Sequence, residues 1–428
     1  MKKTKYLIIG GSVAAINAAE AIRGADTEGT ITIVSDEPCA AYSRPLISYF
    51  LGNKVTEDKM YYRDKKFFDE NRIELITGIR AAGLDAKNRS VKLENGKTVK
   101  FERLLIATGG KPIIPQGVKK GRGVFTFLTW DDAKGIRSYI KKNSASGSAV
   151  IVGGGLIGLK AAEGLMELGI KISIVELADR ILNATFDRNA SGIMENALKK
   201  AGCAIMKNDT VKRIRYKGGN VNAVTLTNGK VLKADMVILA IGVVPNIDIV
   251  KNTPIKTDRG ILTDEHMQTN IKDIYAAGDV AQVYDRILGK TRAIAIWPNA
   301  SRQGRIAGLN MAGVERSYEG SFAMNSVELC GIPTISMGLT DTPDAGYQVL
   351  SELDKDSGSY RKIVLKDNFV VGAIFVGRID RAGIFAGLIK DRIDTGDFAR
   401  HFLSDDFGLI HLPKEYRKHL VTGPGIEI

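Results

Sequence analysis

The chain has 428 residues, of which 44% are hydrophobic and 25% charged, the composition of an ordinary globular protein. This length predicts about three domains, and no run reaches the roughly 20 apolar residues that span a bilayer. The only cysteines are Cys39, Cys203 and Cys330, widely separated in unlike contexts, so neither a disulfide framework nor a paired-cysteine metal or redox site is indicated. We expect a cytoplasmic protein with no metal and no membrane association.

The net charge of +13 is spread along the chain instead of gathered in a tail. It is consistent with a solvated basic surface or with steering of an acidic partner. No nucleic-acid-binding module or interleaving of aromatic and basic residues occurs, so the sequence predicts no nucleic-acid partner. The N-terminus superficially imitates a signal peptide, but Asn17 and Glu20 interrupt its apolar run.

A glycine-rich fingerprint opens the chain, where a hydrophobic strand runs into a helix of small residues. In such a fingerprint the first glycine allows the tight turn, the second position lets the backbone approach a pyrophosphate, and the third small residue lets the helix pack against the strand. The helix N-terminus then offers free N–H groups to the phosphates. The positions concerned are Gly10, Gly11, Ser12 and Ala15.

The elements that follow the fingerprint predict a first nucleotide-binding unit. A second strand ends at Asp36 and Glu37, where a carboxylate can accept hydrogen bonds from an adenosine ribose. Further elements are a helix around 64–71, a strand at 72–77, a hairpin over 90–101 with an Asn95-Gly96 turn, a buried strand from 104 that stops at glycines, and an extended crossing over 111–115.

A second unit repeats this plan. Residues 149–158 read AVIVGGGLIG, and the following strand ends at Glu176. Next come a helix over 189–200, a hairpin around Asn228-Gly229 and a buried strand over 236–242. Two buried βα units with packing glycines are the alternative, but fingerprint, strand and acid recur together. The repeat therefore predicts one nucleotide domain inserted into another.

The C-terminal third has a different texture. A strand over 274–280 ends at Gly278-Asp279, and from about residue 322 short strand-like runs predict a smaller α+β domain. The last thirty or so residues indicate no role. The predicted fold class is α/β, with two Rossmann-like nucleotide-binding domains, one inserted in the other, and a C-terminal α+β cap domain.

These motifs in combination resemble the flavoprotein pyridine nucleotide-disulfide oxidoreductase superfamily, specifically its disulfide-free branch of rubredoxin, ferredoxin and nitrite reductase-type NAD(P)H-dependent flavoproteins. The resemblance covers about residues 5–390. Besides the fingerprints, it rests on residues 42–45, 107–109, 240–246, 276–279, 297–304 and 322–327. It implies that residues 1–113 and 240–315 bind FAD, that 114–239 bind NADH, and that 316–428 form the cap and an extension.

The resemblance also implies roles for individual residues. Gly10, Ser12 and Ala15 would hold the FAD pyrophosphate, and Asp279 would accept a ribityl hydroxyl. Trp297 would shape the flavin pocket, although a core tryptophan is an equal alternative. The other FAD positions are Gly11, Glu37 at the ribose, Arg44, Pro45, Ala81 near the adenine, Ala107, Thr108, Gly109, Gly242 and Gly278. The NADH positions are Gly153, Gly155, Leu156, Ile157, Gly158 and Glu176.

The chain departs from this branch near the reactive part of the flavin. Related enzymes often pair a lysine with a glutamate there, but this chain has Tyr49 at the lysine position and Lys160 at the glutamate position. We treat Lys160 and Tyr49 as catalytic candidates, because a lysine can favour a reduced, anionic flavin; a solvent-facing helix lysine is the alternative. Cys39 does not fall at the reactive cysteine position of the disulfide-dependent relatives, which argues against disulfide chemistry.

Two nucleotide sites without a nucleophile, dyad or metal cluster indicate chemistry carried by cofactors. The resemblance implies an NADH-dependent FAD oxidoreductase that reduces a one-electron carrier, such as rubredoxin, ferredoxin or another iron-sulfur protein that is small and acidic. The protein could act alone, as a homo-oligomer or within a larger redox complex. The alternatives are an NADH oxidase that uses oxygen and a nucleotide-sensing binding or scaffold subunit.

Overall fold

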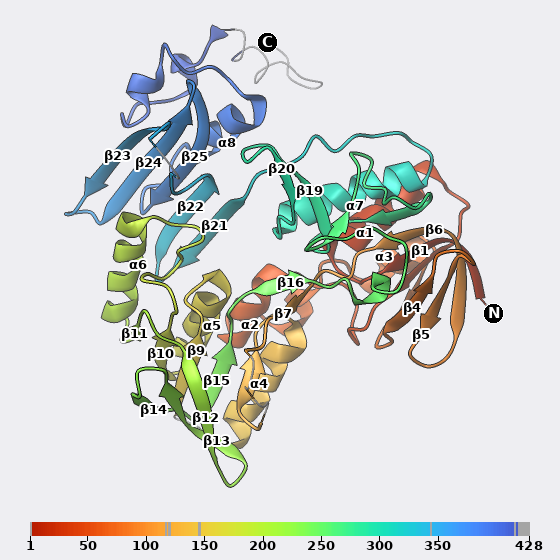
Figure 1. Cartoon of the computed structure of the whole chain (residues 1–428), viewed down its shortest axis with the longest axis horizontal. Helices are drawn as coiled ribbons and strands as arrows, with labels where there is room; N and C mark the ends of the chain where they lie inside the picture. Colours follow the sequence, from red (N-terminus) through yellow and green to blue (C-terminus); the bar gives the residue numbers. More distant parts are fainter. Residues whose placement is uncertain are drawn as a thin grey trace. The chain divides into compact units, whose positions relative to one another are not determined.

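The computed structural model describes residues 2–115, 118, 121–143, 147–342, 345–414 and 417. Internal contacts divide the chain into two compact units, whose main helices and strands are labelled in Figure 1. Unit 1 comprises residues 1–175 and 209–321, and unit 2 comprises residues 176–208 and 322–428. In the described ranges, no helix is long and apolar enough to cross a membrane.

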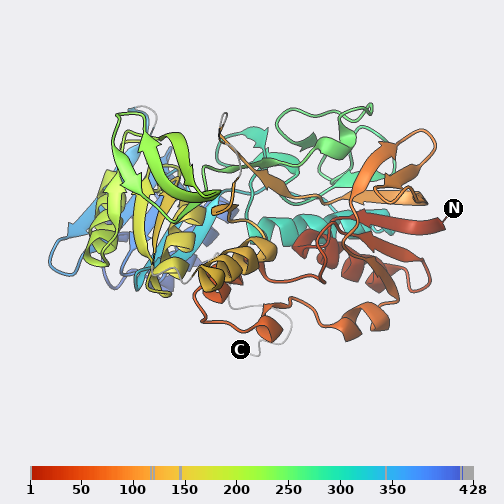
Figure 2. The ribbon, with the colours of Figure 1, turned by 90° about the horizontal axis from the view of Figure 1, so that it is seen from below.

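The main sheet of unit 1 contains the predicted first nucleotide unit. Its strands run in the order β3-β2-β1-β6-β5-β4, with β18 also paired to β6. The strands are β1 (Lys2–Ile9), β2 (Ile31–Val34), β3 (Ile73–Ile76), β4 (Ala81–Asp85), β5 (Ser90–Leu93), β6 (Thr98–Ile106) and β18 (Ile274–Ala276). The pairs among β3, β2, β1, β6 and β18 are parallel, whereas β4, β5 and β6 form an antiparallel meander, seen in orange in Figure 2.

One strand was divided in two by the sequence prediction. The hairpin turn at Asn95-Gly96 is confirmed, with Gly96 at a φ of 81°. The hairpin arm and the separate buried strand expected from residue 104 are, however, the single strand β6. The start of β6 pairs with β5 while almost its whole length pairs with β1, so the ladder continues without a break.

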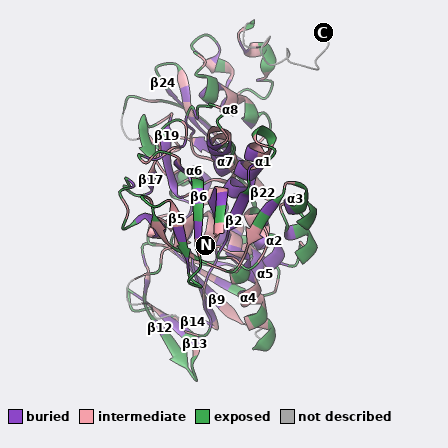
Figure 3. Ribbon diagram, turned by 90° about the vertical axis from the view of Figure 1, so that its right-hand side faces the viewer, coloured by how far each residue is buried: buried purple, intermediate pink, exposed green. Residues whose placement is uncertain are grey.

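Two helices of unit 1 pack with their backbones in close approach. The helices are α1 (Val13–Ala25), α2 (Ile47–Leu51), α3 (Lys65–Glu70), α4 (Trp130–Lys142), α5 (Leu156–Met166) and α7 (Trp297–Met311), with short 3-10 turns η1 (Arg44–Leu46), η2 (Glu57–Met60) and η3 (Asp248–Val250). A Cβ added at Gly304 or Gly308 would lie 2.1 or 2.4 Å from a carbonyl oxygen of α1. Glycines on α7 therefore let α1 and α7 touch, and both helices carry buried residues, coloured purple in Figure 3.

The second nucleotide unit contributes a parallel sheet in the order β10-β9-β15-β8. These strands are β8 (Val124–Thr126), β9 (Ser148–Val152), β10 (Lys171–Val175) and β15 (Met236–Leu239). An antiparallel meander, β12 (Val211–Lys217), β13 (Asn220–Leu226) and β14 (Val231–Lys233), contains the predicted Asn228-Gly229 turn. The remaining strands are β7 (Gly110–Pro112), β16 (Val243–Pro245), β17 (Ile261–Leu262), β19 (Ala281–Asp285) and β20 (Lys290–Arg292). The start of the predicted extended crossing at 111–115 belongs to β7, which pairs antiparallel with β16 to form a two-stranded ribbon.

Unit 2 has an antiparallel sheet in the order β21-β22-β25-β24-β23. Its elements are α6 (Arg188–Lys200), β11 (Ala204–Met206), β21 (Met324–Leu329), β22 (Ile332–Gly338), β23 (Gln348–Asp354), β24 (Ser359–Lys366), β25 (Phe369–Val376), α8 (Ala382–Asp391), η4 (Ala399–His401) and η5 (Leu409–His411). The tail, for which the sequence indicated no role, supplies core side chains: the rings of Phe402 and Phe407 lie 5.1 and 5.3 Å from that of Phe385 on α8.

The fold class is α/β, as predicted. The predicted domain boundaries follow sequence motifs, which keep residues 114–239 together. Internal contacts instead group residues 176–208 with the C-terminal sheet. α6 contacts β24 and β25 there, which accounts for this grouping.

Candidate functional site

A cavity of about 360 Å³ lies in unit 1, within the size range of ligand-binding sites. It is open to solvent and is formed by the ends of strands and the starts of helices. Its wall is made by Ile9–Ala14, Val34–Glu37, Arg44, Pro45, Arg80, Ala81, Ala107–Gly109, Ile157, Asn246, Asp248, Ile249, Ala277–Asp279, Ala295–Trp297 and Ala300. Much of the predicted FAD site is therefore gathered around one cavity.

The first glycine of each fingerprint is required by a close approach of two backbone segments. Gly10 has a φ of 116°, and a Cβ there would lie 2.1 Å from the carbonyl oxygen of Ala107. Gly153 has a φ of 108°, and its Cβ would lie 2.3 Å from the carbonyl oxygen of Ala240. A side chain fits at neither position. The repeat thus explains why Ala107 and Ala240 begin matching motifs.

The N-terminus of α1 opens into the cavity. Ser12 is the N-cap residue, and its side chain makes no capping hydrogen bond. The N–H groups of the first turn and the positive end of the helix dipole suit an anionic group such as a pyrophosphate. Ala15 is fully buried and does not line the cavity, so its position fits the packing role of the third small residue.

A network of three side chains fixes the predicted ribose carboxylate. The Arg44 guanidinium donates a hydrogen bond of 2.6 Å to Glu37, and the Tyr42 hydroxyl donates one of 2.7 Å to its other oxygen. Tyr42 in turn accepts a hydrogen bond from the backbone N–H of Trp130 at 3.0 Å. Burial raises the pKa of Tyr42, so its hydroxyl remains protonated as a donor. Glu37 and Arg44 are therefore held in place on the cavity wall.

The turn after β18 presents a carboxylate that suits a neutral polyol. Gly278 has a φ of 82°, and its N–H donates a 2.8 Å hydrogen bond to the buried side chain of Gln303. This fixes Asp279, which receives no hydrogen bond from any group in the described part of the chain. Burial raises the pKa of Asp279, and the Arg44 charge opposes that shift. Asp279 is a ready acceptor for a ligand hydroxyl.

Among the cavity residues outside the predicted site positions, three carry polar side chains that bear on ligand binding: Asn246, Asp248 and Arg80. The side-chain oxygen of Asn246 is buried, and no described group donates a hydrogen bond to it. Such an orphaned acceptor is costly unless a ligand or water pairs with it. The Asp248 carboxylate binds Lys111 and Lys251 at 2.8 and 2.7 Å, which lowers its pKa to about 2. Arg80 lies 3.4 Å from Asp248.

Of Asn246, Asp248 and Arg80, only Asn246 had a signal in the sequence, because it belongs to the motif at residues 240–246.

The cavity offers groups that match the parts of FAD. The acceptors of Asp279 and Asn246, unpaired within the described residues, match the polyol hydroxyls, the fixed Glu37 carboxylate matches the ribose, and the α1 N-terminus matches the pyrophosphate. We find that the cavity residues fit this cofactor.

Trp297 lines the cavity as the first residue of α7 and is partly exposed. Its ring meets that of Tyr62 edge-on at 5.4 Å between centroids. Trp297 is thus placed at the cavity, and its role beside the flavin stays a prediction.

The structure brings the two catalytic candidates together outside the cavity wall. The Lys160 ammonium on α5 pairs with Glu163 and lies 4.6 Å from the centre of the Tyr49 ring on α2. The Lys160 side chain is only 15% exposed, so it is not the solvent-facing lysine considered as its alternative. Neither Lys160 nor Tyr49 lines the cavity.

The second fingerprint contributes one residue to the cavity wall. Gly155 is the N-cap of α5, and a Cβ at Gly158 would lie 2.1 Å from the carbonyl oxygen of Gly153. Ile157, in the first turn of α5, lines the cavity. Gly242 has a φ of 122° beyond β15. The other predicted NADH positions, Leu156 included, do not line it.

Glu176 directly follows β10. Its carboxylate accepts a 2.8 Å hydrogen bond from the N–H of Ala178, and its own N–H donates to Met206 at 2.8 Å. The nearby Arg180 binds Asp179 at 3.2 Å and Asp341 at 2.9 Å. These partners neutralise the cation that could have bound a 2′-phosphate.

Neither Cys39 nor Cys203 shows a sign of activation. Burial and the nearby Glu37 charge raise the pKa of the Cys39 thiol, and burial raises that of Cys203 to about 11. Reactive thiols have lowered pKa values instead. Within the described ranges, no group of three or more metal-ligating side chains occurs.

Replacing Asp279 by alanine is expected to weaken FAD binding by roughly ten- to hundredfold, because a hydrogen bond to a charged acceptor contributes about 1.5 to 3 kcal/mol. Fluorescence titration of the apoprotein with FAD measures the change. Glu94→Ala, an exposed carboxylate outside the cavity wall, is the matched control. Equal affinities of both variants would contradict the role assigned to Asp279.

Comparisons with known proteins agree with this site. The family model for pyridine nucleotide-disulphide oxidoreductases matches residues 4–304, and that for the rubredoxin NAD+ reductase C-terminal domain matches residues 324–393. The chain is 33% identical to the NADH-dependent phenylglyoxylate dehydrogenase subunit epsilon of Aromatoleum evansii, over 95% of this chain and 96% of that one.

Two further proteins are similar to the chain. The crystal structure of NADH:rubredoxin oxidoreductase from Clostridium acetobutylicum has a TM-score of 0.76 and 29% identity, covering 93% of this chain and 98% of that one. An NADH oxidase of Methanocaldococcus jannaschii is 34% identical over 73% of this chain and 71% of that protein.

Proposed function

Because the chain belongs to the pyridine nucleotide-disulphide oxidoreductase family, we propose that it passes electrons from NADH through FAD to a one-electron carrier. The carrier in this proposal is rubredoxin, ferredoxin or another iron-sulfur protein. The protein is a flavin- and nicotinamide-dependent oxidoreductase. Residues 1–113 and 240–315 would form the FAD domain, residues 114–239 the NADH domain, and residues 316–428 the cap and extension.

One observation carries the proposal: the helices that follow both fingerprints reach the same cavity. Ser12 is the N-cap of α1 and Ile157 lies in the first turn of α5, and both line the wall. A nucleotide on the second fingerprint would therefore lie next to a cofactor on the first. Adjacent sites are what electron transfer between two bound nucleotides requires.

The residues of the chain hold and orient the cofactor. The α1 N-terminus would bind the pyrophosphate, Glu37 the ribose, and Asp279 and Asn246 the polyol hydroxyls. Arg44, Pro45, Ala81 and Trp297 would enclose the rings and exclude water. When bound, FAD supplies redox chemistry that links a two-electron donor to a one-electron acceptor. The paired Lys160 and Tyr49 would position the approaching nicotinamide end of NADH from α5 and α2.

The acceptor is tested through the basic charge. A protein of net charge +13 should attract an acidic carrier from a distance. Salt screens this attraction, so that at physiological ionic strength it extends only about 8 Å. Reduction of rubredoxin or ferredoxin should therefore fall by roughly tenfold as ionic strength rises from low to physiological values. Anaerobic stopped-flow spectroscopy measures it, with flavin reduction by NADH as the internal control. A carrier rate that is flat with salt would contradict attraction by charge.

The similarity to an NADH oxidase supports a second candidate, transfer to oxygen. Oxygen uptake faster than reduction of any carrier would favour it. The similarity to a dehydrogenase subunit supports a third, a nucleotide-sensing subunit. NADH-dependent binding to a partner without multiple turnovers with any acceptor would favour that.

A further inference from the structure

The segment that carries Glu176 is bound at several points within unit 2. We call residues 176–187 the nucleotide loop. Asn208 donates its N–H to Ala178 at 3.0 Å, and Ser191 of α6 donates its hydroxyl to Ile181 at 2.8 Å. Asp187 ends the loop as the N-cap of α6 and accepts the N–H of Ala190 at 3.1 Å. The loop thus runs from a nucleotide carboxylate to a helix cap.

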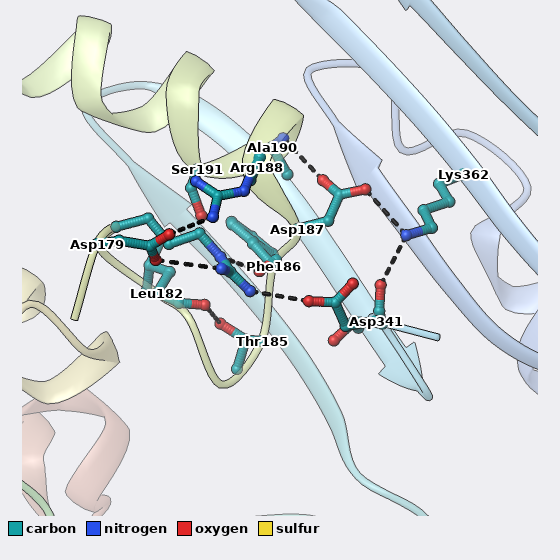
Figure 4. Close-up of polar contacts among 12 residues, drawn as sticks. Asp179, Leu182, Thr185, Phe186, Asp187, Arg188, Ala190, Ser191, Asp341 and Lys362 are labelled. Carbon is teal, nitrogen blue, oxygen red and sulfur yellow. Dashed lines mark hydrogen bonds and ion pairs between the residues drawn. The ribbon is translucent and has the colours of Figure 1, made fainter. Parts of the chain in front are cut away.

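The C-terminal sheet holds the far end of this loop through a buried charge pair. Lys362 of β24 lies 3.1 Å from the second oxygen of Asp187 (Figure 4). The same oxygen also accepts the Tyr360 hydroxyl at 2.7 Å. The same ammonium donates to the carbonyl of Thr340 at 2.9 Å. The Lys362 side chain is 8% exposed, so this pair is shielded from water. With the Ala190 N–H, the Tyr360 hydroxyl and the Lys362 ammonium, the Asp187 carboxylate has a donor on each oxygen.

The middle of the loop is held from the same domain. Arg180 reaches Asp341, next to Thr340, at 2.9 Å, and also binds Asp179, which holds Arg188 in turn (Figure 4). The Asp341 side chain is 66% exposed, so this pair is weaker than the buried one. Residues 340–341 and 362 therefore clamp a loop more than 150 residues earlier in the chain.

We propose that Lys362 and Asp341 are positioning residues for nucleotide recognition: by clamping the nucleotide loop they hold Glu176 where it selects a ribose 2′-hydroxyl. The inference rests on the proposed use of NADH. It gives the C-terminal domain a part in choosing the nucleotide. The same clamp pairs the Arg180 guanidinium with Asp341, so that it is not available to bind a 2′-phosphate.

The physical basis is pre-organisation. If a loop becomes ordered only when the ligand binds, the free energy of ordering is subtracted from the binding free energy. A loop that is already ordered avoids this cost. Removing Lys362 leaves the buried Asp187 charge with one fewer partner and loosens the loop. Removing the Asp341 charge loosens the loop less and leaves Asp179 as the carboxylate partner of Arg180. Both changes should weaken ADP-ribose binding and reduce the preference over the 2′-phosphorylated form.

The test measures binding of ADP-ribose and of 2′-phospho-ADP-ribose by calorimetry to the flavin-loaded full chain. Lys362→Met is expected to raise the Kd of ADP-ribose about tenfold, which is roughly 1.4 kcal/mol, and to shrink the preference between the two ligands. Asp341→Asn should give a smaller change in the same direction, and Lys362→Arg should restore most of the affinity. Lys366→Met on β24 and Asp356→Asn, both exposed, are the matched controls.

Flavin content and the rate of flavin reduction at saturating NADH should stay at wild-type values in all variants. Unchanged Kd values in both Lys362→Met and Asp341→Asn would overturn the inference. If Lys362→Met loses flavin or unfolds, Asp341→Asn decides, since its exposed side chain supports no core. A wild-type protein that binds neither ligand would overturn the proposed function instead.

Discussion

Replacing Gly10 by alanine is expected to leave the purified protein with less than about a tenth of its FAD. The φ of 116° at Gly10 is strained for any L side chain, and the new Cβ would lie 2.1 Å from the carbonyl oxygen of Ala107. Relief requires moving the turn that shapes the phosphate site. The flavin-to-protein absorbance ratio measures the loss. Gly24→Ala on α1, the helix that follows Gly10, has no heavy atom within 4 Å of its Cβ; it is the control and should retain FAD.

The companion variant Gly153→Ala should separate the two nucleotide sites. Its Cβ would meet Ala240 as that of Gly10 meets Ala107, at 2.3 Å. This protein should retain FAD and accept electrons from dithionite, but its reduction by NADH should be lost. Loss of FAD from Gly153→Ala with retention in Gly10→Ala would mean that the two fingerprints have the opposite cofactors.

The parts of the fold that were predictable have local causes. Strand, fingerprint, small-residue helix and second strand follow each other within about 30 residues in a βαβ unit, and an Asn-Gly pair marks a hairpin without reference to the rest of the chain. The first βαβ unit, both hairpins and the short strands of the C-terminal sheet were therefore predicted in place. The recurrence of Gly10 as Gly153 made the architecture predictable as well.

Long-range pairing explains what was missed. The sequence prediction divided β6 into two strands. The start of β6 has a local hairpin signal, from its pairing with β5, whereas its parallel pairing with β1 joins residues far apart in the sequence. Asp248 enters the cavity because β16 returns beside β7, a pairing over more than 130 residues that no local pattern indicates. The clamp of Lys362 on Asp187 is equally non-local. In the sequence, Lys362 looks like one more residue of an amphipathic strand.

NADH should reduce the flavin about ten- to hundredfold more efficiently than NADPH. Glu176 ends β10, where a carboxylate accepts the ribose 2′-hydroxyl and repels a 2′-phosphate, and a hydrogen bond to a charged group contributes about 1.5 to 3 kcal/mol. The backbone N–H of Ala178 donates a hydrogen bond to that carboxylate and so fixes it. Arg180, the nearby cation, is already bound to Asp179 and Asp341.

Stopped-flow reduction of the flavin by each nucleotide gives the two efficiencies. Glu176→Ala should lower the efficiency with NADH and raise that with NADPH, because both the acceptor and the repulsion are lost. Glu167→Ala, an exposed glutamate just beyond α5, should leave the ratio unchanged. If wild-type protein uses NADPH as well as NADH, Glu176 does not face the ribose. A Glu176→Ala variant with unaltered preference would place the selection elsewhere in the chain.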